Sequence, residues 1–382
     1  MDHCLSWLKK YKVEGISGVP QAAHVVFWPS AVRSGGGKNH MISKRSLMNT
    51  MRRKFWGLAK KIINFVLAKT TIVSDAVSLV PFVLQCYFSR RQVIIIGLTR
   101  RMGDIVACEP VARHVRKKHP NAYIVWCCGA EYRELSDSNP CIDRTVVVDC
   151  LYVWSCLKRA LMNCKIIDLH LSGSFCRHCG YRLIKRDAEI TTENYYYFGG
   201  LLEAFTKGEK VTVPIKKPNI YIGRDIQQQV DELKLPKQFI VIHGLSSDAQ
   251  RAWDRHKWLA LAKNLLIKYQ YGIVEIGLEP VLAQVQSHNY LNLCRQTSIL
   301  ETAEVIRRSV FYIGVDSGPA HLASAVGTRG IILLGRFGKF DRYDPFGGVA
   351  TNLSPLRSSG SVSSISVATI NGLVEKEITS FA

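Results

Sequence analysis

The chain has 382 residues, of which 47% are hydrophobic and 21% are charged, and its formal net charge is +21. This composition excludes a disordered chain, and the length exceeds the roughly 250–300 residues that one hydrophobic core organises, so two domains are expected. Residues 1–91 contain 15 Lys and Arg against 3 Asp and Glu, a net charge of +12. Such a basic segment favours an anionic surface as its partner, either phospholipid or nucleic acid.

Residues 1–90 are predicted to form a basic extension that contains one amphipathic helix. The apolar core and cleavage site of a secretory signal are not found near its start. Over 52–68, apolar residues recur at helical spacing among lysines and arginines, which predicts a helix that lies in the membrane interface or docks on the following domain. The apolar stretch 72–88 contains Asp75 and Pro81 and is shorter than the about 20 residues of a membrane span.

Twelve cysteines occur in the sequence without regular spacing. In a chain of this size they are typical of reduced thiols in a cytoplasmic protein. Cys176 and Cys179 form one C-x-x-C, with His178 between them and His170 upstream. A zinc site usually needs a second such pair at a defined spacing, and none is apparent, so thiols without a metal are favoured over a metal site.

From Val93 onward the sequence alternates between apolar runs and helical patterns. This alternation predicts a Rossmann-like αβα domain, a parallel sheet with helices on both faces, over residues 91–215. A polar stretch from Lys207 to Pro218 is the expected interdomain linker. The expected strands are 93–96, 123–127, 145–148 and 166–169, and a helix is expected from Asp104 to about Lys118.

The same alternation returns over residues 219–350 and predicts a second Rossmann-like αβα domain. A Ser- and Gly-rich tail and a final helix are expected over 351–382. Two such domains in tandem bind ligands at the carboxyl ends of their strands and face each other across a cleft. The expected strands are 239–243, 272–276, 311–315 and 331–334, and the expected helices are 258–269, 302–308, 319–326 and 367–378.

A tight turn at Asp316-Ser317-Gly318 separates a predicted strand from a predicted helix that begins near Pro319. The backbone amides of Ser317 and Gly318 would then form an anion site at a helix N-terminus, which a phosphate can approach closely because Gly318 has no Cβ. The spacing fits equally well a structural helix that Asp316 or Ser317 caps.

Asp104 follows the first predicted strand, at the mouth of the expected cleft. A carboxylate there could accept a proton from an acceptor hydroxyl, or it could cap a helix. Arg251 follows the first strand of the second domain and could bind a diphosphate with two parallel N–H donors. The sequence contains no Asp-x-Asp, which predicts that a leaving diphosphate is stabilised without a metal. The loop at Gly103 does not complete a G-x-G-x-x-G, which argues against a nicotinamide site.

Together these runs resemble glycosyltransferase family 9, the heptosyltransferase family of lipopolysaccharide core assembly. The strand, the Gly103-Asp104 loop and the Pro-containing helix look like the family's first segment, here residues 93–110. The most specific match is Asp-Ser-Gly-Pro-x-His-Leu-Ala, here residues 316–323. The resemblance covers roughly residues 91–347.

The resemblance implies a GT-B fold and an inverting, metal-independent transfer that uses no cofactor. A sugar, heptose or a similar one, would move from a nucleotide-diphosphate donor such as ADP-heptose to a lipopolysaccharide or related surface-glycan acceptor. Asp104 would be the catalytic base, and Arg251 occupies the position of a phosphate-binding lysine. The implied donor-binding residues are Arg251, Glu279, Asp316, Ser317, Gly318 and His321, of which Glu279 matches a ribose-binding carboxylate.

The basic extension is expected to hold a cytoplasmic protein at the inner face of the cytoplasmic membrane, where lipid-linked saccharide acceptors reside. Anionic lipid, and no nucleic acid, is therefore the expected surface partner. Two alternatives remain open at this point. A nucleotide-sugar epimerase of similar fold would convert the donor without an acceptor. A non-catalytic basic protein with an inactive nucleotide pocket would attach to nucleic acid or membrane, and a steeply salt-dependent affinity for DNA would favour it.

Overall fold

A computed structural model describes residues 77–379, apart from Met162, Ser247, 337–342, 347–351 and Ser359. The amphipathic helix expected over 52–68, and most of the basic extension, lie outside the described residues. None of the helices in the described part of the chain is long and apolar enough to cross a membrane.

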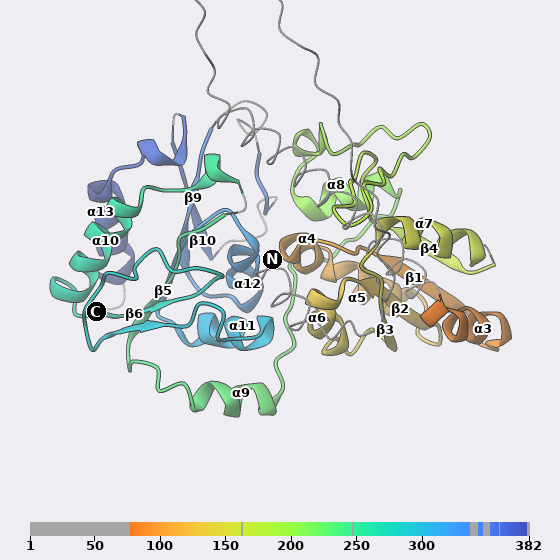
Figure 1. Cartoon of the computed structure of the whole chain (residues 1–382), viewed down its shortest axis with the longest axis horizontal. Helices are drawn as coiled ribbons and strands as arrows, with labels where there is room; N and C mark the ends of the chain where they lie inside the picture. Colours follow the sequence, from red (N-terminus) through yellow and green to blue (C-terminus); the bar gives the residue numbers. More distant parts are fainter. Residues whose placement is uncertain are drawn as a thin grey trace, which may run out of the picture. The chain divides into compact units, whose positions relative to one another are not determined.

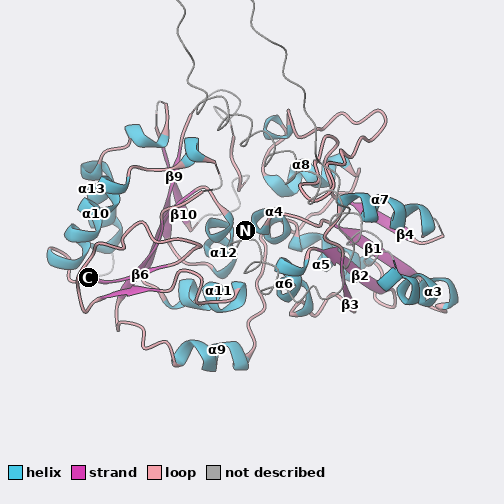
Figure 2. Ribbon diagram, in the orientation of Figure 1, coloured by secondary structure: helices cyan, strands magenta, loops and turns pink. Residues whose placement is uncertain are grey.

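The first sheet has four parallel strands in the order β3-β2-β1-β4 (Figures 1 and 2). Its central strand β1 is a continuous buried run, as a sheet covered on both faces requires. Ile94 and Ile96 pack toward α5, whereas Ile95 packs toward α3 and α7. The strands are β1 (Val93–Gly97), β2 (Tyr123–Cys128), β3 (Arg144–Val147) and β4 (Lys165–Asp168).

The helices of this domain connect its strands and cover the sheet. They are α3 (Val80–Phe88), α4 (Met102–Ala107), α5 (Glu109–Lys118), α6 (Arg133–Asp137), α7 (Leu151–Ala160) and α8 (Leu201–Gly208), with short 3-10 turns η1 (Ala130–Tyr132) and η2 (Tyr195–Tyr197). The single helix predicted from Asp104 to Lys118 is wrong, because two helices meet at Cys108. Pro110 explains the break, since it has no N–H to donate to Val106 and its ring crowds that carbonyl.

The second sheet has six parallel strands in the order β10-β9-β8-β5-β6-β7 (Figure 2). Four of these strands were expected, and the edge strands β7 and β10 were not. They are β5 (Phe239–His243), β6 (Gly272–Glu275), β7 (Tyr290–Asn292), β8 (Phe311–Val315), β9 (Gly330–Leu334) and β10 (Leu353–Arg357).

Helices again lie on both faces of the second sheet. Ile240 and Ile242 of β5 share a core with Trp258 of α10, whereas Val241 packs with Val305 of α11. The helices are α9 (Arg224–Asp231), α10 (Arg255–Ile267), α11 (Ile299–Arg308), α12 (Gly318–Val326) and α13 (Val367–Thr379), with 3-10 turns η3 (Ala249–Arg251) and η5 (Val362–Ser364). The predicted α/β class with two parallel sheets is confirmed.

Candidate active site

Three segments at the carboxyl ends of strands carry the residues that the sequence singles out. Asp104 lies on α4, just after β1, and Arg251 ends η3, which follows β5. Gly318 begins α12, just after β8, and α12 packs against α4. The carboxyl ends of parallel strands are where ligands bind in open α/β sheets, so these elements position a site between the two sheets.

Two glycines allow α4 and α12 to approach closely. A Cβ on Gly103 would lie 2.7 Å from Cδ2 of His321, and a Cβ on Gly318 would lie 2.3 Å from Cε of Met102. Contacts this short require a neighbour to shift, and the buried ring of His321 has less freedom than the end of the Met102 side chain. Gly103 is therefore the position where a side chain would separate the two helices.

Arg251 and Asp316 form an ion pair at the centre of this group. Nη1 of Arg251 lies 3.0 Å from Oδ2 of Asp316, which is buried. Burial raises the pKa of Asp316, and the charges of Arg251 and Arg357 oppose that rise. The sequence assigned both residues to the same donor-binding site, and the structure places them in direct contact.

Asp104 lies within electrostatic reach of the same ion pair. Desolvation raises the pKa of Asp104 to about 6, against the lowering effects of Arg101 and Arg251, and Asp316 adds to the rise. The N-cap of α4 is Arg101, and its side chain makes no capping hydrogen bond. A carboxyl group with a pKa near neutrality is suited to accept a proton in a reaction at neutral pH.

Ser317 is the N-cap of α12, but its hydroxyl does not cap the helix. Its Oγ donates to the carbonyl of Val315 at 3.1 Å and lies 3.0 Å from Nδ1 of His243, which is then the donor to Oγ. The interpretation of Ser317 as a structural side-chain cap is therefore wrong. The first amides of α12 keep the arrangement that favours an anion at a helix N-terminus.

Two buried imidazoles, His243 and His321, border the turn. Desolvation lowers the pKa of each to about 4, and Arg251 lowers that of His321 further. Both rings are therefore uncharged at neutral pH. The ring of His321 lies 4.8 Å from that of Phe346, centroid to centroid, so α12 and the segment 343–346 form one wall of the site.

Tyr195 and Tyr343 lie beside the candidate site, close to Asp104, Arg251 and Asp316. Neither tyrosine was predicted as a site residue. Their ring centroids lie 6.0 Å apart in an edge-to-face arrangement. Burial raises the pKa of both hydroxyls. The charges of Asp104 and Asp316 raise it further, and the charge of Arg251 lowers it. The run of aromatic residues at 195–198 was the available signal, but it has no strand or helix period.

Glu279 differs from the other predicted site residues. Its side chain is 71% exposed and pairs with Arg295 at 3.4 Å. Within the described residues, no hydrogen bond or ion pair joins Glu279 to the group around Asp104. The buried acid of this region is Glu275, which accepts hydrogen bonds from the N–H groups of Val281 and Leu282.

A buried polar chain supports the loop that leads to α4. The Thr99 N–H donates to Nε2 of His170 at 3.0 Å, and Nδ1 of His170 lies 2.7 Å from Oδ1 of Asp168. The ring proton is therefore on Nδ1 and is donated to Asp168. Although burial opposes it, the hydrogen bond from His170 and the nearby lysines Lys158 and Lys185 hold the pKa of Asp168 well below its usual range.

We expect His170→Leu to lower the free energy of unfolding by about 1–3 kcal/mol for each buried polar partner that it leaves unsatisfied. The matched control is His256→Leu, an exposed histidine on α10, which should leave stability nearly unchanged. Urea unfolding of both variants measures the difference. Equal midpoints for the two variants would contradict a structural role for the Asp168–His170–Thr99 chain.

Comparisons with known proteins find similarity to one family of glycosyltransferases. Residues 213–343 match the model of glycosyltransferase family 9 (heptosyltransferase). None of the curated proteins matches the chain. A glycosyltransferase family 9 structure from Veillonella parvula DSM 2008 is similar at 16% identity and a TM-score of 0.58, covering 76% of this chain and 97% of that one.

Two solved structures from E. coli are similar as well. The ADP-heptose lps heptosyltransferase II has 14% identity and a TM-score of 0.58, covering 76% of this chain and all of the other. Heptosyltransferase WaaC with ADP has 15% identity and a TM-score of 0.53, covering 75% of this chain and 100% of that one. At these identities the likeness concerns the fold, which is GT-B, as expected. Residues 213–343 thus match glycosyltransferase family 9 (heptosyltransferase) within a chain of GT-B fold, and this match supports glycosyltransferase activity.

Proposed function

We propose that the enzyme transfers a heptose from ADP-heptose, or from a similar nucleotide-diphosphate sugar, to a lipopolysaccharide or related surface-glycan acceptor. The family match over 213–343 supports the sugar-transfer class, and two similar solved structures are named as heptosyltransferases. The observation that carries the proposal is the packing of α4, which bears Asp104, against α12, which begins beside the Arg251–Asp316 ion pair.

The reaction is a direct displacement at the anomeric carbon. The Asp104 carboxylate accepts the proton of the acceptor hydroxyl, whose oxygen bonds to the anomeric carbon. The bond from that carbon to the diphosphate oxygen breaks on the opposite face, so the configuration inverts and the diphosphate takes the electron pair. Arg251 and the amides of Ser317 and Gly318 stabilise the added negative charge, which a divalent metal need not do.

The remaining predicted residues shape the donor pocket. Asp316 orients the guanidinium of Arg251, and the uncharged ring of His321 forms the wall beside Phe346. Glu279 binds the ribose hydroxyls once its side chain leaves Arg295, because an exposed ion pair of this kind contributes little energy.

The donor and the reaction are tested together. Thermal unfolding with ADP, ADP-heptose and uridine or guanosine diphosphate sugars identifies the nucleotide, since a ligand of the native state raises its melting temperature. ADP-heptose and heptose-deficient lipopolysaccharide should then give a product one heptose heavier, with inverted anomeric configuration and in the presence of a chelator. Conversion of ADP-heptose without acceptor would instead indicate an epimerase, and stabilisation by no nucleotide would indicate a non-catalytic protein.

The pH dependence of kcat/KM is expected to follow the Asp104 carboxyl group. Its pKa is raised to about 6 by desolvation, and the base must be unprotonated to act. Activity should therefore be constant at higher pH, fall to half near pH 6 and then fall about tenfold per pH unit. Donor affinity measured over the same range is the control. A midpoint near pH 4, the usual value for an aspartate, would contradict this assignment.

The basic N-terminal residues are proposed to attach the enzyme to the anionic inner face of the cytoplasmic membrane. The test removes residues 1–76 and keeps α3, because Phe82 and Cys86 of α3 are buried in the core of the first sheet. The shortened chain should no longer sediment with vesicles that contain anionic phospholipid, yet should keep its response to donor. Unchanged sedimentation would assign the attachment to another surface.

A further inference from the structure

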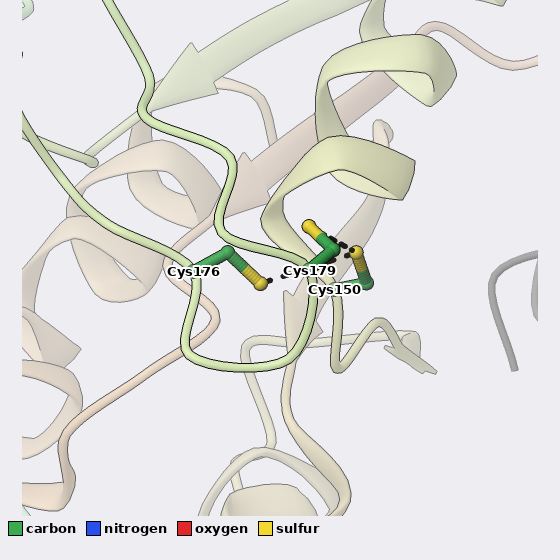
Figure 3. Close-up of side chains that lie close together, drawn as sticks. All are labelled: Cys150, Cys176 and Cys179. Carbon is green, nitrogen blue, oxygen red and sulfur yellow. Dashed lines mark hydrogen bonds between the residues drawn. The ribbon is translucent and has the colours of Figure 1, made fainter. Parts of the chain in front are cut away.

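Three cysteine side chains from two distant segments of the N-terminal domain converge on one point (Figure 3). Cys150 follows β3 and is the N-cap of α7, whereas Cys176 and Cys179 lie in the segment after β4. Their Sγ atoms all lie within 4.8 Å of one another. Sγ of Cys150 is 3.4 Å from that of Cys179 and 4.0 Å from that of Cys176.

We propose that Cys150, Cys176 and Cys179 bind one zinc ion, or another divalent ion that prefers sulfur, through three thiolates. A tetrahedral zinc with Zn–S bonds of about 2.3 Å places two sulfur ligands about 3.8 Å apart. The separations of 3.4 and 4.0 Å lie on either side of that value. The third pair, Cys176 and Cys179, also lies within 4.8 Å, so small side-chain rotations can bring all three sulfurs to bonding distance.

The turn that contains the C-x-x-C motif is built to present a thiolate. Cys176 N–H donates to Tyr181 O at 2.8 Å, and Gly180 N–H donates to Cys176 O at 2.9 Å, so the segment closes as a tight hairpin. Gly180 has a φ of +76°, a left-handed conformation that favours glycine. The backbone conformation directly after Cys179 therefore favours glycine at that position.

Backbone amides surround the buried sulfur of Cys176. The N–H groups of Leu151, His178 and Cys179 donate to it, and Sγ of Cys150 lies 4.0 Å away. Hydrogen bonds to the charged form stabilise it, and a metal-ligating cysteine must be in that form. The backbone donors around Cys176 and the positions of the three sulfurs both favour thiolates that bind one metal ion.

The sequence alone could not reveal this site, because its third ligand is not part of a second C-x-x-C. Cys150 lies 26 residues before Cys176, and the junction of β3 and α7 brings it to the hairpin. Cys179 is partly exposed, so a water molecule can complete the tetrahedron.

A metal here would stabilise a segment with little regular structure. Between β4 and α8, the regular structure of the chain consists of two isolated bridges, Ser172–Thr191 and Phe175–Arg182, and the short turn η2. Connections of this length without secondary structure are uncommon in compact domains. The same segment carries Tyr195, which faces the candidate active site. Metal binding at the three thiols would therefore add to the folding energy of this irregular segment of the N-terminal domain.

Cobalt(II) binding to the full-length, reduced and metal-free protein tests the proposal. One equivalent should produce a thiolate-to-cobalt charge-transfer band, and one equivalent of zinc should remove it. Cys150→Ser, Cys176→Ser and Cys179→Ser should each weaken the band by about a third and lower zinc affinity at least about 100-fold, since ligands matter more than their supporting groups. Cys156→Ser, an exposed cysteine on α7, is the matched control and should change neither.

The cobalt titration of the wild-type protein tests the proposal even if a variant misfolds. Thermal unfolding identifies any variant that misfolds. No charge-transfer band at one equivalent in the wild type would overturn the proposal. A band that survives both Cys176→Ser and Cys179→Ser would place cobalt at other thiols and would also overturn it. A Cys150–Cys179 disulfide that forms in air despite one equivalent of zinc, detected by mass spectrometry, would assign the cluster to redox chemistry instead.

Discussion

Asp104→Asn is expected to lower kcat of sugar transfer by about 10²–10⁴-fold, because an amide cannot accept the proton of the acceptor hydroxyl. The side chain keeps its size, so the packing of α4 against α12 should persist. Donor binding should change little, since the diphosphate is assigned to Arg251 and the turn at Ser317 and Gly318. Initial rates with saturating donor, together with donor-induced thermal stabilisation, measure the two effects separately.

The matched control is Asp137→Asn on α6, an exposed aspartate that pairs with Arg133 at the surface. This variant should retain both activity and donor binding, because exposed ion pairs contribute little. A slow Asp104→Asn enzyme should also lose the activity midpoint near pH 6. If the variant instead loses donor stabilisation and activity together, Asp104 serves the donor site and the general base must be sought elsewhere.

The central strands could be predicted because burial on both faces leaves no choice of residue type. β1, β5 and β8 are apolar runs apart from His243 at the end of β5, and each is buried along its whole length. β7 and β10 were missed because edge strands need no such run. β10 contains Pro355 and the partly exposed Arg357, which an edge position tolerates and a central one does not.

The candidate site was partly predictable for a similar reason. Asp104, Arg251 and Asp316 each follow a predictable strand, so their common edge could be derived from parallel topology. Tyr195 and Tyr343 could not be found in this way, because their contact depends on how irregular segments of two domains meet. Sequence periodicity specifies elements, whereas contacts between irregular segments follow from packing that leaves no local pattern.

Arg251→Met should lower kcat by about 10²–10³-fold, the usual effect of removing one stabiliser of a developing charge. The same change leaves Asp316 buried without its partner, 3.0 Å away in the wild type, and such a loss destabilises a protein by about 3–5 kcal/mol. Arg251→Lys keeps the charge without the planar pair of donors, so a smaller loss of activity is expected from it. Melting temperatures and rates must be compared on all variants.

The double variant Arg251→Met with Asp316→Asn separates the two roles of the arginine. Removing both charges relieves the unpaired buried carboxylate, so the melting temperature should return toward that of the wild type. Activity should stay low, because nothing in the double variant replaces the guanidinium at the leaving diphosphate. Recovery of activity along with stability would show that Arg251 acts only by neutralising Asp316, and the leaving group would then depend on the amides of the Ser317–Gly318 turn and the dipole of α12 alone.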